Sequence, residues 1–414
     1  MQPGGSPALA GANFAPGAPL LIGNAINGIP NPNLHWETVT ETNIGLDGEA
    51  LKSRLYFTVE WYNRTTKNML YALPLPLSSG FTSAYFDNIG NVSSKGVDIL
   101  LGYRDHVGKL GYDVSVNGGF NTNKVTNLDG ITTSTLPDGY NFYINGAGNT
   151  GYGAMPNQTI TLTKAGLPFG SFYGYKAVGI FQTNAQAAAS AQPNAQAGDL
   201  IFAHNPKYGN ALSDSDQQVI GNPNPKFVFG INIRLSYQGF DLTALFTGVL
   251  GVQLFNGVKS YAEFPFSTDG NTTTRAFKDS YFGNNGLTSQ PRMGFLNSGG
   301  TYTLDPNHNY STVSSYFVEN GNYIKMKNLQ LGYTFSNSLL AKAKVRSARL
   351  FVMGNNLFVI TKYSGLDPEI GSANSVAQSA GYVGGGVGVT TRGLDAVSQY
   401  PHTRIYSAGL DINF

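Results

Sequence analysis

Asp367 and Glu369 are the two residues whose spacing comes nearest to acid and base chemistry in this sequence. They flank Pro368, so two carboxylates stand two positions apart. A pair of carboxylates is what glycoside hydrolases use to protonate the leaving group and to activate water or form a covalent intermediate. The stretch reads as a loop, however, where neighbouring carboxylates are more often solvated turn residues. We therefore expect Asp367 and Glu369 to be solvated and not catalytic.

Asp214 and Asp216, which follow Asn205 closely, suggest an oxygen-rich loop that could hold a hard cation such as Ca²⁺. Calcium needs several convergent oxygens, and the run of acidic residues at alternate positions that a calcium loop requires is absent here. The sequence therefore predicts a solvated loop without a metal at this position.

The remaining motifs for catalysis or cofactor binding are weak. Gly146, Gly148 and Gly151 match the pattern GxGxxG, but no helical pattern follows them, and a chain with 52 glycines produces such a match by coincidence. The five histidines, with no pair three or four positions apart, are His35, His106, His204, His308 and His402. The sequence also has no GxSxG, Walker A or HExxH motif. We predict no catalytic residue, no metal and no cofactor, and hence no enzyme.

The composition limits the class of protein to which the chain can belong. Charged residues make up 12% of the 414 residues, about half of the roughly 25% found in soluble globular proteins. The net charge is +2 with acids and bases interspersed, which does not favour a nucleic-acid partner. No stretch approaches the ~18 to 20 apolar residues of a membrane helix. A β-barrel can still cross a membrane at this mean hydropathy, because its strands alternate apolar and polar residues.

Such alternation recurs along the chain and indicates strands whose two faces differ in polarity. In the first example, Leu55, Phe57, Val59 and Trp61 alternate with Tyr56, Thr58, Glu60 and Tyr62. Equivalent segments lie at 97–104, 112–121, 227–238, 240–246, 329–335 and 406–414. We count roughly ten to twelve segments of the length, about 9 to 11 residues, that suits a tilted membrane strand.

The connections between these segments are of two kinds. Short polar turns at 106–109 and 238–239 predict antiparallel hairpins, whereas 126–156, 257–315 and 365–400 are long and rich in Gly, Ser, Asn and Thr. The Ala-rich stretch 184–197 predicts one short helix in a loop, interrupted at Pro193. Together these features predict an all-β fold, a transmembrane antiparallel β-barrel with short periplasmic turns and long extracellular loops. The alternative fold is a soluble β-sandwich, propeller or solenoid.

The last strand carries the most specific signal for a barrel. Tyr406, Leu410, Ile412 and the terminal Phe414 share one parity, so we predict that they form a lipid-facing edge which the barrel-assembly machinery recognises. At the other end, Met1 to Pro16 has neither a basic region nor an apolar core and is not a signal peptide. We expect residues 1–33 to form an irregular loop, and export information to lie upstream of this chain.

An ordered set of motifs resembles the SusC/RagA family of TonB-dependent outer-membrane transporters of Bacteroidetes-type bacteria. The motifs are Leu34-His35-Trp36-Glu37, Leu73-Pro74-Leu75-Pro76, Asn88-Ile89-Gly90-Asn91-Val92, Gly179-Ile180-Phe181-Gln182, Ile220-Gly221-Asn222-Pro223, Lys327-Asn328-Leu329-Gln330-Leu331-Gly332-Tyr333, Gly354-Asn355-Asn356-Leu357-Phe358 and Tyr363-Ser364-Gly365-Leu366-Asp367-Pro368-Glu369. The resemblance implies a barrel of about 22 strands filled by a plug, of which residues 34–414 would supply the C-terminal half. Signal peptide and plug would then be absent from this chain. In the family a loop between the Gly-Ile-Phe-Gln and Ile-Gly-Asn-Pro motifs is often rich in Asp, whereas here 202–209 is not, which argues against a cation there.

The expected function is uptake of a nutrient, an oligosaccharide or a peptide, across the outer membrane. The resemblance implies a SusD-like lipoprotein as a lid and the TonB complex, acting through the missing N-terminal part, as the energy source. Aromatic residues in 257–315 and 365–400 are candidates for substrate contact, since aromatic rings stack on sugars. The alternatives are a passive porin-like channel and a soluble secreted carbohydrate-binding β protein.

Overall fold

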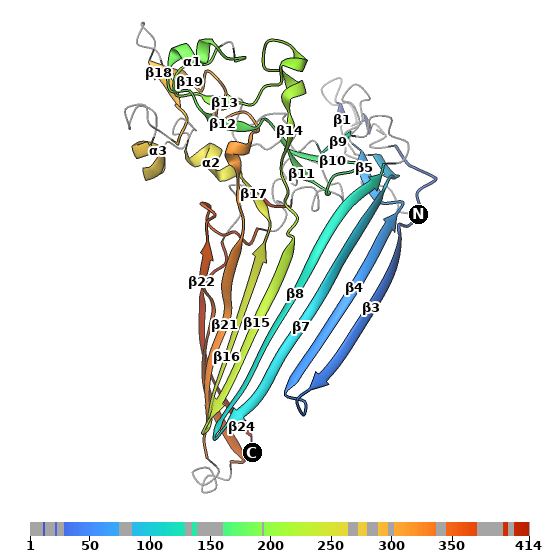
Figure 1. Cartoon of the computed structure of the whole chain (residues 1–414), viewed down its shortest axis with the longest axis vertical. Coiled ribbons are helices and arrows are strands. Elements are labelled where there is room, and N and C mark those ends of the chain that lie inside the picture. Colours follow the sequence, from blue (N-terminus) through green and yellow to red (C-terminus); the bar gives the residue numbers. More distant parts are fainter. Residues whose placement is uncertain are drawn as a thin grey trace.

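The chain builds one large antiparallel sheet with a layer of loops at one end (Figure 1). The computed structural model describes residues 11–12, 21–22, 29–73, 85–128, 135–138, 160–192, 194–263, 272–279, 289–296, 302–336, 345–370, 392–395 and 401–413. Nine strands pair in the order β24-β22-β21-β16-β15-β8-β7-β4-β3. Their bounds are β3 Thr38–Ala50, β4 Leu55–Lys67, β7 Asn91–Val107, β8 Leu110–Asn127, β15 Phe227–Tyr237, β16 Phe240–Leu250, β21 Tyr323–Thr334, β22 Ser347–Thr361 and β24 Ile405–Asn413. The fold is therefore all-β, as predicted.

The sheet has one apolar face and one polar face, and the register keeps each face continuous across the strands. Val59 of β4 pairs with Ile99 of β7, and its sequence neighbour Thr58 pairs with Leu100. We call the side that carries Phe57, Val59 and their register partners the apolar face, and the side that carries Thr58 and its partners the polar face. Many apolar-face side chains are exposed, among them Ile44, Leu46, Leu101, Val116, Leu331, Leu350, Val352 and Leu410. The predicted alternation is confirmed.

The two predicted hairpins are present, the second with its predicted turn at 238–239 and the first with a turn of two residues, 108–109, in place of the predicted 106–109. Strand β7 turns through Gly108 and Lys109 into β8, and β15 turns through Gln238 and Gly239 into β16. Both central residues of the second turn have positive φ, 47° and 92°, as a two-residue turn that follows the strand twist requires. The long sheet contains nine strands within the described residues, against the ten to twelve expected, and β7 and β8 run for 17 and 18 residues, longer than the expected length of about 9 to 11.

Short strands and helices form a separate layer above the long strands, which we call the loop layer (Figure 1). Its elements are β10 Thr161–Lys164, β11 Ser171–Gly174, β12 Ala177–Ile180, α1 Asn184–Ala188, β13 Leu200–Phe202, η2 Pro206–Tyr208, η3 Asp214–Asp216, β14 Gln218–Gly221, β17 Gln253–Asn256, α2 Gly257–Ala262, α3 Thr274–Asp279, β18 Gly294–Leu296, β19 Tyr302–Leu304, η4 Ser315–Phe317, β20 Val318–Asn320 and β23 Leu394–Asp395. The other short strands are β1 Gly11–Ala12, β2 Leu21–Ile22, β5 Leu70–Leu73, β6 Tyr85–Asn88 and β9 Thr135–Asp138.

The loop layer has its own hydrophobic core, so it is a folded structure and not a set of loose connections. The core consists of Ile160, Phe172, Phe255, Val313, Phe317 and Leu394. Helix α1 begins at Asn184 because Thr183 caps it by accepting a hydrogen bond from the Gln186 NH. This confirms the short helix predicted in 184–197. No helix within the described residues is long and apolar enough to cross a membrane.

A prediction for the sheet follows from a close contact between Gly248 and Phe229, which pair across β15 and β16. A Cβ at Gly248 would lie 2.3 Å from Phe229 Cζ and 2.8 Å from the Tyr323 carbonyl oxygen. Gly248→Ala should therefore destabilise the sheet by roughly 1 to 3 kcal/mol, measured as a lower melting temperature of the complete gene product in detergent. The matched control is Gly179→Ala, whose Cβ would have its nearest neighbour at 3.6 Å. Equal melting temperatures for the two variants would contradict this prediction.

Candidate functional site

A cluster of five ionisable side chains joins the loop layer to the polar face of the sheet. Lys325 and Lys327 belong to β21, Asp367 and Glu369 follow the end of β22, and His402 precedes β24. We call this cluster the loop anchor. Lys325 Nζ lies 3.0 Å from Asp367 Oδ2 and 2.7 Å from Glu369 Oε2, and His402 Nδ1 lies 2.9 Å from Asp367 Oδ2. The long connection between β22 and β24 is thus held at both of its ends.

The local structure explains why the two lysines reach the same carboxylates. Lys325 points to the polar face, because it pairs with Thr247 of β16, and Lys327 is the extra residue of a β-bulge between Met326 and Asn328. A bulge turns the side chain of its extra residue, and Lys327 thereby contacts both oxygens of Glu369. The prediction that Asp367 and Glu369 are solvated carboxylates was therefore wrong. The side chain of Asp367 is only 12% exposed, and that of Lys325 is 3% exposed.

The electrostatics of the loop anchor favour ionised carboxylates. Burial acts to raise the pKa of Asp367, but hydrogen bonds from the Glu369 NH, the His402 side chain and Lys325 outweigh it and lower the pKa to about 2. Burial likewise opposes ionisation of Glu369, and hydrogen bonds from Lys325 and Lys327 lower its pKa overall. An ionised carboxylate with such a low pKa is a poor general acid near neutral pH. The loop anchor is therefore suited to holding the chain in place and not to acid catalysis.

Asp367, Glu369 and His402 could also be considered as metal ligands, since their ligand atoms lie within 4.8 Å of one another. The two ammonium groups of Lys325 and Lys327 already contact the carboxylates at hydrogen-bond distance. A divalent cation would be repelled by these positive charges and would compete with them for the same oxygens. We assign this group as an ion-pair cluster.

A second buried polar network lies next to the hydrophobic core of the loop layer. Lys259 of α2 is 7% exposed, donates to the Tyr316 carbonyl at 3.0 Å and lies 3.6 Å from Glu319 Oε1. Burial lowers the pKa of Lys259, an effect that the nearby carboxylates partly offset. Glu319 also accepts hydrogen bonds from the NH and the hydroxyl of Ser364. This network therefore links α2, β20 and the segment after β22.

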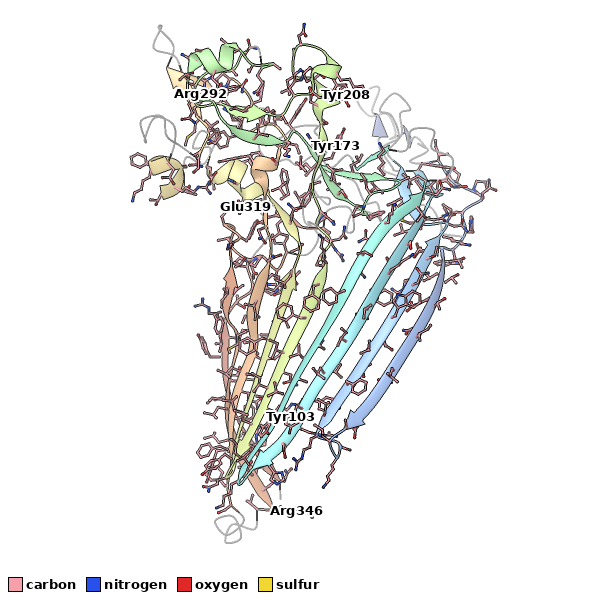
Figure 2. The ribbon with its side chains drawn as sticks, viewed as in Figure 1. Tyr103, Tyr173, Tyr208, Arg292, Glu319 and Arg346 are labelled. Atoms are coloured by element: carbon pink, nitrogen blue, oxygen red, sulfur yellow. The ribbon has the colours of Figure 1, made fainter. Side chains whose placement is uncertain are left out.

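A third network holds the outermost part of the loop layer together. Arg292 and Asp199 form a two-pronged ion pair, with Nε to Oδ1 at 2.6 Å and Nη2 to Oδ2 at 2.8 Å. Asn309 donates to the same carboxylate at 2.9 Å and accepts from the Leu200 NH at 2.8 Å. Arg292 and Glu319 both lie in the loop layer, far from the short turns near Tyr103 (Figure 2). Because these buried charged groups are hydrogen-bonded to one another, they fix the relative positions of the three chain segments that carry Asp199, Arg292 and Asn309.

Asp216 hydrogen-bonds to the backbone of the loop layer, whereas Asp214 accepts hydrogen bonds from the Tyr175 hydroxyl and the Gln217 side chain. Asp216 accepts from the Asn205 NH at 2.8 Å, from the Ser213 NH at 3.0 Å and pairs with His204 Nδ1 at 3.1 Å. Burial acts to raise the pKa of Asp216, but these hydrogen bonds lower it overall. The prediction of a solvated loop was wrong for Asp216, which is buried and closes the short helix η3. Its oxygens are occupied by donors, which disfavours a cation.

The polar face carries a band of charged side chains near the short turns, which we call the polar belt. Its members are Glu49, Arg104, Asp113, Arg234, Asp241, Arg349 and Asp411. Arg104 contacts Glu49 at 3.3 Å and stacks over the Tyr56 ring, whose hydroxyl donates to Asp113 at 2.8 Å. Arg349 bridges Asp241 of β16 and Asp411 of β24. Alternating charges thus bind neighbouring strands to one another and give this wall a hydrophilic surface.

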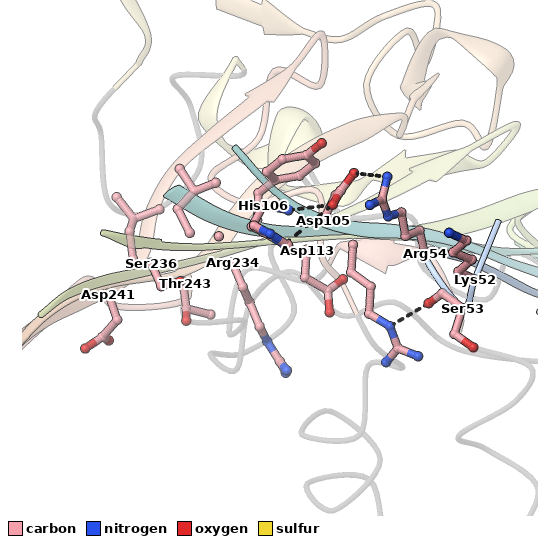
Figure 3. A pocket seen from close by; sticks show the side chains of 15 residues that line it. Lys52, Ser53, Arg54, Asp105, His106, Asp113, Arg234, Ser236, Asp241 and Thr243 are labelled. Atoms are coloured by element: carbon pink, nitrogen blue, oxygen red, sulfur yellow. Dashed lines mark hydrogen bonds and ion pairs between the residues drawn. The ribbon is translucent and has the colours of Figure 1, made fainter. Parts of the chain in front are cut away.

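Part of the polar belt borders a hollow of about 670 Å³ at the short-turn end of the sheet (Figure 3). Four basic residues line the hollow, Lys52, Arg54, Arg104 and Arg234. Arg54 pairs with Asp105 at 3.0 Å, and Arg104 donates to the Ser53 carbonyl at 2.9 Å. No motif in the sequence marks these four residues as a group. Basic residues at strand ends beside tight turns were the available signal.

The predicted barrel-assembly signal, the glycine motif and the aromatic candidates for substrate contact lie in different parts of the chain. Tyr406, Leu410 and Ile412 lie together on the apolar face of β24 and are exposed, whereas Phe414 lies outside the described residues. Their recognition by the assembly machinery stays a prediction. The glycine motif at 146–151 also lies outside the described residues. Among the described aromatic side chains of 257–315 and 365–400, Phe277 is 75% exposed and Tyr310 is fully buried, so Tyr310 is no candidate for substrate contact.

The model of the family described as TonB dependent receptor-like, beta-barrel, matches residues 5–357. The chain belongs to this TonB-dependent receptor family. It is 28% identical over 395 residues to TonB-dependent receptor P3 of Formosa agariphila, covering 95% of this chain and 36% of that protein. It is 26% identical over 388 residues to TonB-dependent receptor SusC of Bacteroides thetaiotaomicron, covering 93% of this chain and 32% of that protein. These matches confirm the predicted SusC/RagA resemblance.

The fold of this TonB-dependent receptor chain agrees with a solved structure of the RagAB peptide transporter. The TM-score is 0.69 at 24% identity, and the match covers 99% of this chain and 38% of the other. A likeness at this identity supports the fold. The chain spans about a third of the length of the curated relatives that it matches.

Proposed function

We propose that this chain forms part of the wall and part of the extracellular loop layer of an outer-membrane barrel that imports a nutrient. The observation that carries the proposal is the apolar face, which leaves large side chains such as Leu46 and Leu101 more than half exposed across several strands. A water-facing sheet would lose stability by exposing such a surface, whereas lipid chains would cover it. The polar face would then line the lumen, and residues 34–414 would supply its C-terminal portion.

We propose that transport depends on TonB and that the substrate is an oligosaccharide or a peptide. The relatives named as TonB-dependent receptors support the dependence on TonB. The RagAB peptide transporter, whose fold this chain shares, supports a peptide as one of the two substrate classes. The loop layer would contact a SusD-like lipoprotein, and upstream segments of the gene product would contact TonB. The packed cores and ion pairs of the loop layer support this role, because a rigid platform suits the docking of a partner protein.

The membrane part of the proposal predicts a labelling pattern with a period of two. In the complete gene product, a photoreactive reagent dissolved in lipid should label Phe57, Val59, Leu410 and Ile412, and it should spare Thr58 and Asp411. Each spared residue is the sequence neighbour of a labelled one, so the control is internal to the strand. Labelling of Thr58 and Asp411 in place of their neighbours, or recovery of the folded protein without detergent, would defeat the membrane proposal.

The transport part is tested separately by uptake into cells that express the complete gene product. Uptake of oligosaccharides or of peptides should stop when a protonophore removes the proton-motive force. Uptake that persists would indicate a passive channel and contradict TonB dependence. Cells in which the gene is deleted provide the background value for both substrate classes.

A further inference from the structure

A basic groove lies on the apolar face of β4, β7 and β8, at the end of the strands next to the loop layer. Its lower part is a hollow of about 410 Å³ whose lining includes Trp61, Val97 and Phe120 together with Lys95 and Lys226. Trp61 pairs with Val97, and Val97 pairs with Phe120, so these three side chains form one row across the sheet. Trp61 is 42% exposed and Phe120 is 52% exposed. The floor of the groove is therefore an open aromatic and aliphatic surface.

The upper part of the groove is polar and carries a further lysine. It is a hollow of about 460 Å³ lined by Ser93, Lys124 and Thr126, and it shares Lys95 and Thr122 with the lower part. The two hollows are therefore adjacent, and the lining loses its aromatic residues along the strand direction toward the loop layer. Strands β7 and β8 are neighbours along their whole length (Figure 1).

The register places the ammonium groups of Lys95 and Lys124 within reach of one anion. Lys95 pairs with Thr122 and Ser93 pairs with Lys124, so the two lysines are diagonal neighbours on the same face. Diagonal neighbours are about 7 to 8 Å apart, within the reach of two long side chains that point to a common centre. Neither lysine has an ion-pair partner within the part of the chain that the structure describes. Their positive charges are thus available to a ligand.

The surrounding charges favour an anion in this groove. The adjacent positions of β4 on the same face are Asn63, opposite Lys95, and Thr65, opposite Ser93. The acidic residues of these strands that lie nearest the groove, Glu60 and Asp98, pair with each other on the polar face and so lie on the other side of the sheet. The other two, Asp105 and Asp113, lie at the short-turn end of the hairpin. Within the described residues, the lining of the groove therefore combines three lysines, Lys95, Lys124 and Lys226, with the Ser93 hydroxyl and with no carboxylate.

We propose that this groove binds the phosphorylated headgroup of a membrane lipid, a proposal that rests on the membrane location of the apolar face. The acyl chains would pack against Trp61, Val97 and Phe120, and the phosphate would contact Lys95, Lys124 and the Ser93 hydroxyl. The Thr122 and Thr126 hydroxyls donate to the carbonyls of Lys95 and Asn91. A soluble phosphate would not use the apolar floor, whereas a lipid uses both parts at once. Interfacial aromatic residues and lysines occupy this level of a membrane protein, where the headgroups lie.

The test is lipid retention by the complete gene product, purified in detergent and mixed with lipid A, whose glucosamine headgroup carries two phosphates. Native mass spectrometry measures the fraction of protein with bound lipid. Each lysine near an anionic membrane surface contributes about a factor of five to binding, so Lys95→Gln with Lys124→Gln should weaken retention about thirty-fold. The matched control is Lys109→Gln, which removes the same charge in the turn at the other end of the same hairpin.

Each outcome is decisive. Lipid A from which both phosphates have been removed should bind about as weakly to the wild type as lipid A binds to the double variant, and inorganic phosphate alone should not displace lipid A. Equal retention by wild type and double variant, equal retention of the dephosphorylated lipid, or displacement by inorganic phosphate would each overturn the proposal. A protein that labels as a membrane barrel but fails here would leave the membrane proposal intact.

Discussion

Replacing Arg292 by Met should release the outer part of the loop layer, with the largest loss of stability that we expect for a single substitution in this chain. Arg292 and Asp199 are 3% and 0% exposed, and the substitution leaves the Asp199 carboxylate buried without its counter-charge. Removing one partner of a buried ion pair costs about 3 to 5 kcal/mol. Hydrogen exchange of the Leu200 NH, which is bonded to Asn309 at 2.8 Å, should accelerate by about two to three orders of magnitude.

Two further variants separate the charge effect from a general disturbance. Arg346→Met removes an exposed arginine at the start of β22 and should leave the exchange rate of Leu200 unchanged. The double variant Arg292→Met with Asp199→Leu removes both charges, and it should recover a large part of the lost protection, because an apolar pair of similar volume can replace a buried ion pair. If Arg292→Met exchanged at the wild-type rate, the ion pair would not hold this layer together.

Most of the long sheet could be predicted from the sequence, because membrane strands have a period that is visible in a single chain. The alternation of Leu55 to Tyr62 predicts both the strand and its two faces, and the short turn Gln238-Gly239 predicts the register of the hairpin around it. Strand β3 is harder to predict from the sequence. Its residues Thr38–Ala50 include many polar and small side chains, and they show the alternation only when paired with β4.

The loop layer and the loop anchor could not be predicted in the same way, because their contacts join residues far apart in the chain. Lys325 and Asp367 are 42 positions apart, and Arg292 and Asp199 are 93 positions apart. No repeating pattern in the sequence connects residues that are so far apart. One signal was present, since Lys325 and Lys327 repeat the two-residue spacing of Asp367 and Glu369 with opposite charge. The match predicts these ion pairs only if Lys327 is known to lie in a β-bulge. The bulge arises from how β21 pairs with its neighbouring strands.

The loop anchor gives the second prediction with a large effect. Lys325→Met should free the segment after β22, since Lys325 is 3% exposed and contacts both carboxylates. We expect a loss of roughly 3 kcal/mol in local stability, against less than about 1 kcal/mol for the matched control Lys327→Met. Lys327 is 25% exposed, and within the described part of the chain its ion-pair partner is Glu369 alone. Exchange of the Glu369 and His402 NH groups, both bonded to Asp367, measures the difference.

The pH dependence of hydrogen exchange at these NH groups identifies the carboxylate whose ionisation stabilises the loop anchor. The pKa of Asp367 is lowered from 3.8 to about 2, so the folded state binds the proton less readily than the unfolded state does. The stabilisation that ionised Asp367 gives to the folded loop anchor is therefore complete above pH 3.8 and is lost as the pH falls through about 2. After correction for intrinsic exchange, protection of the His402 NH should stay constant from neutral pH down to about 4 and then fall. In Asp367→Asn this step should disappear, and a step that persisted would assign the titration to another carboxylate.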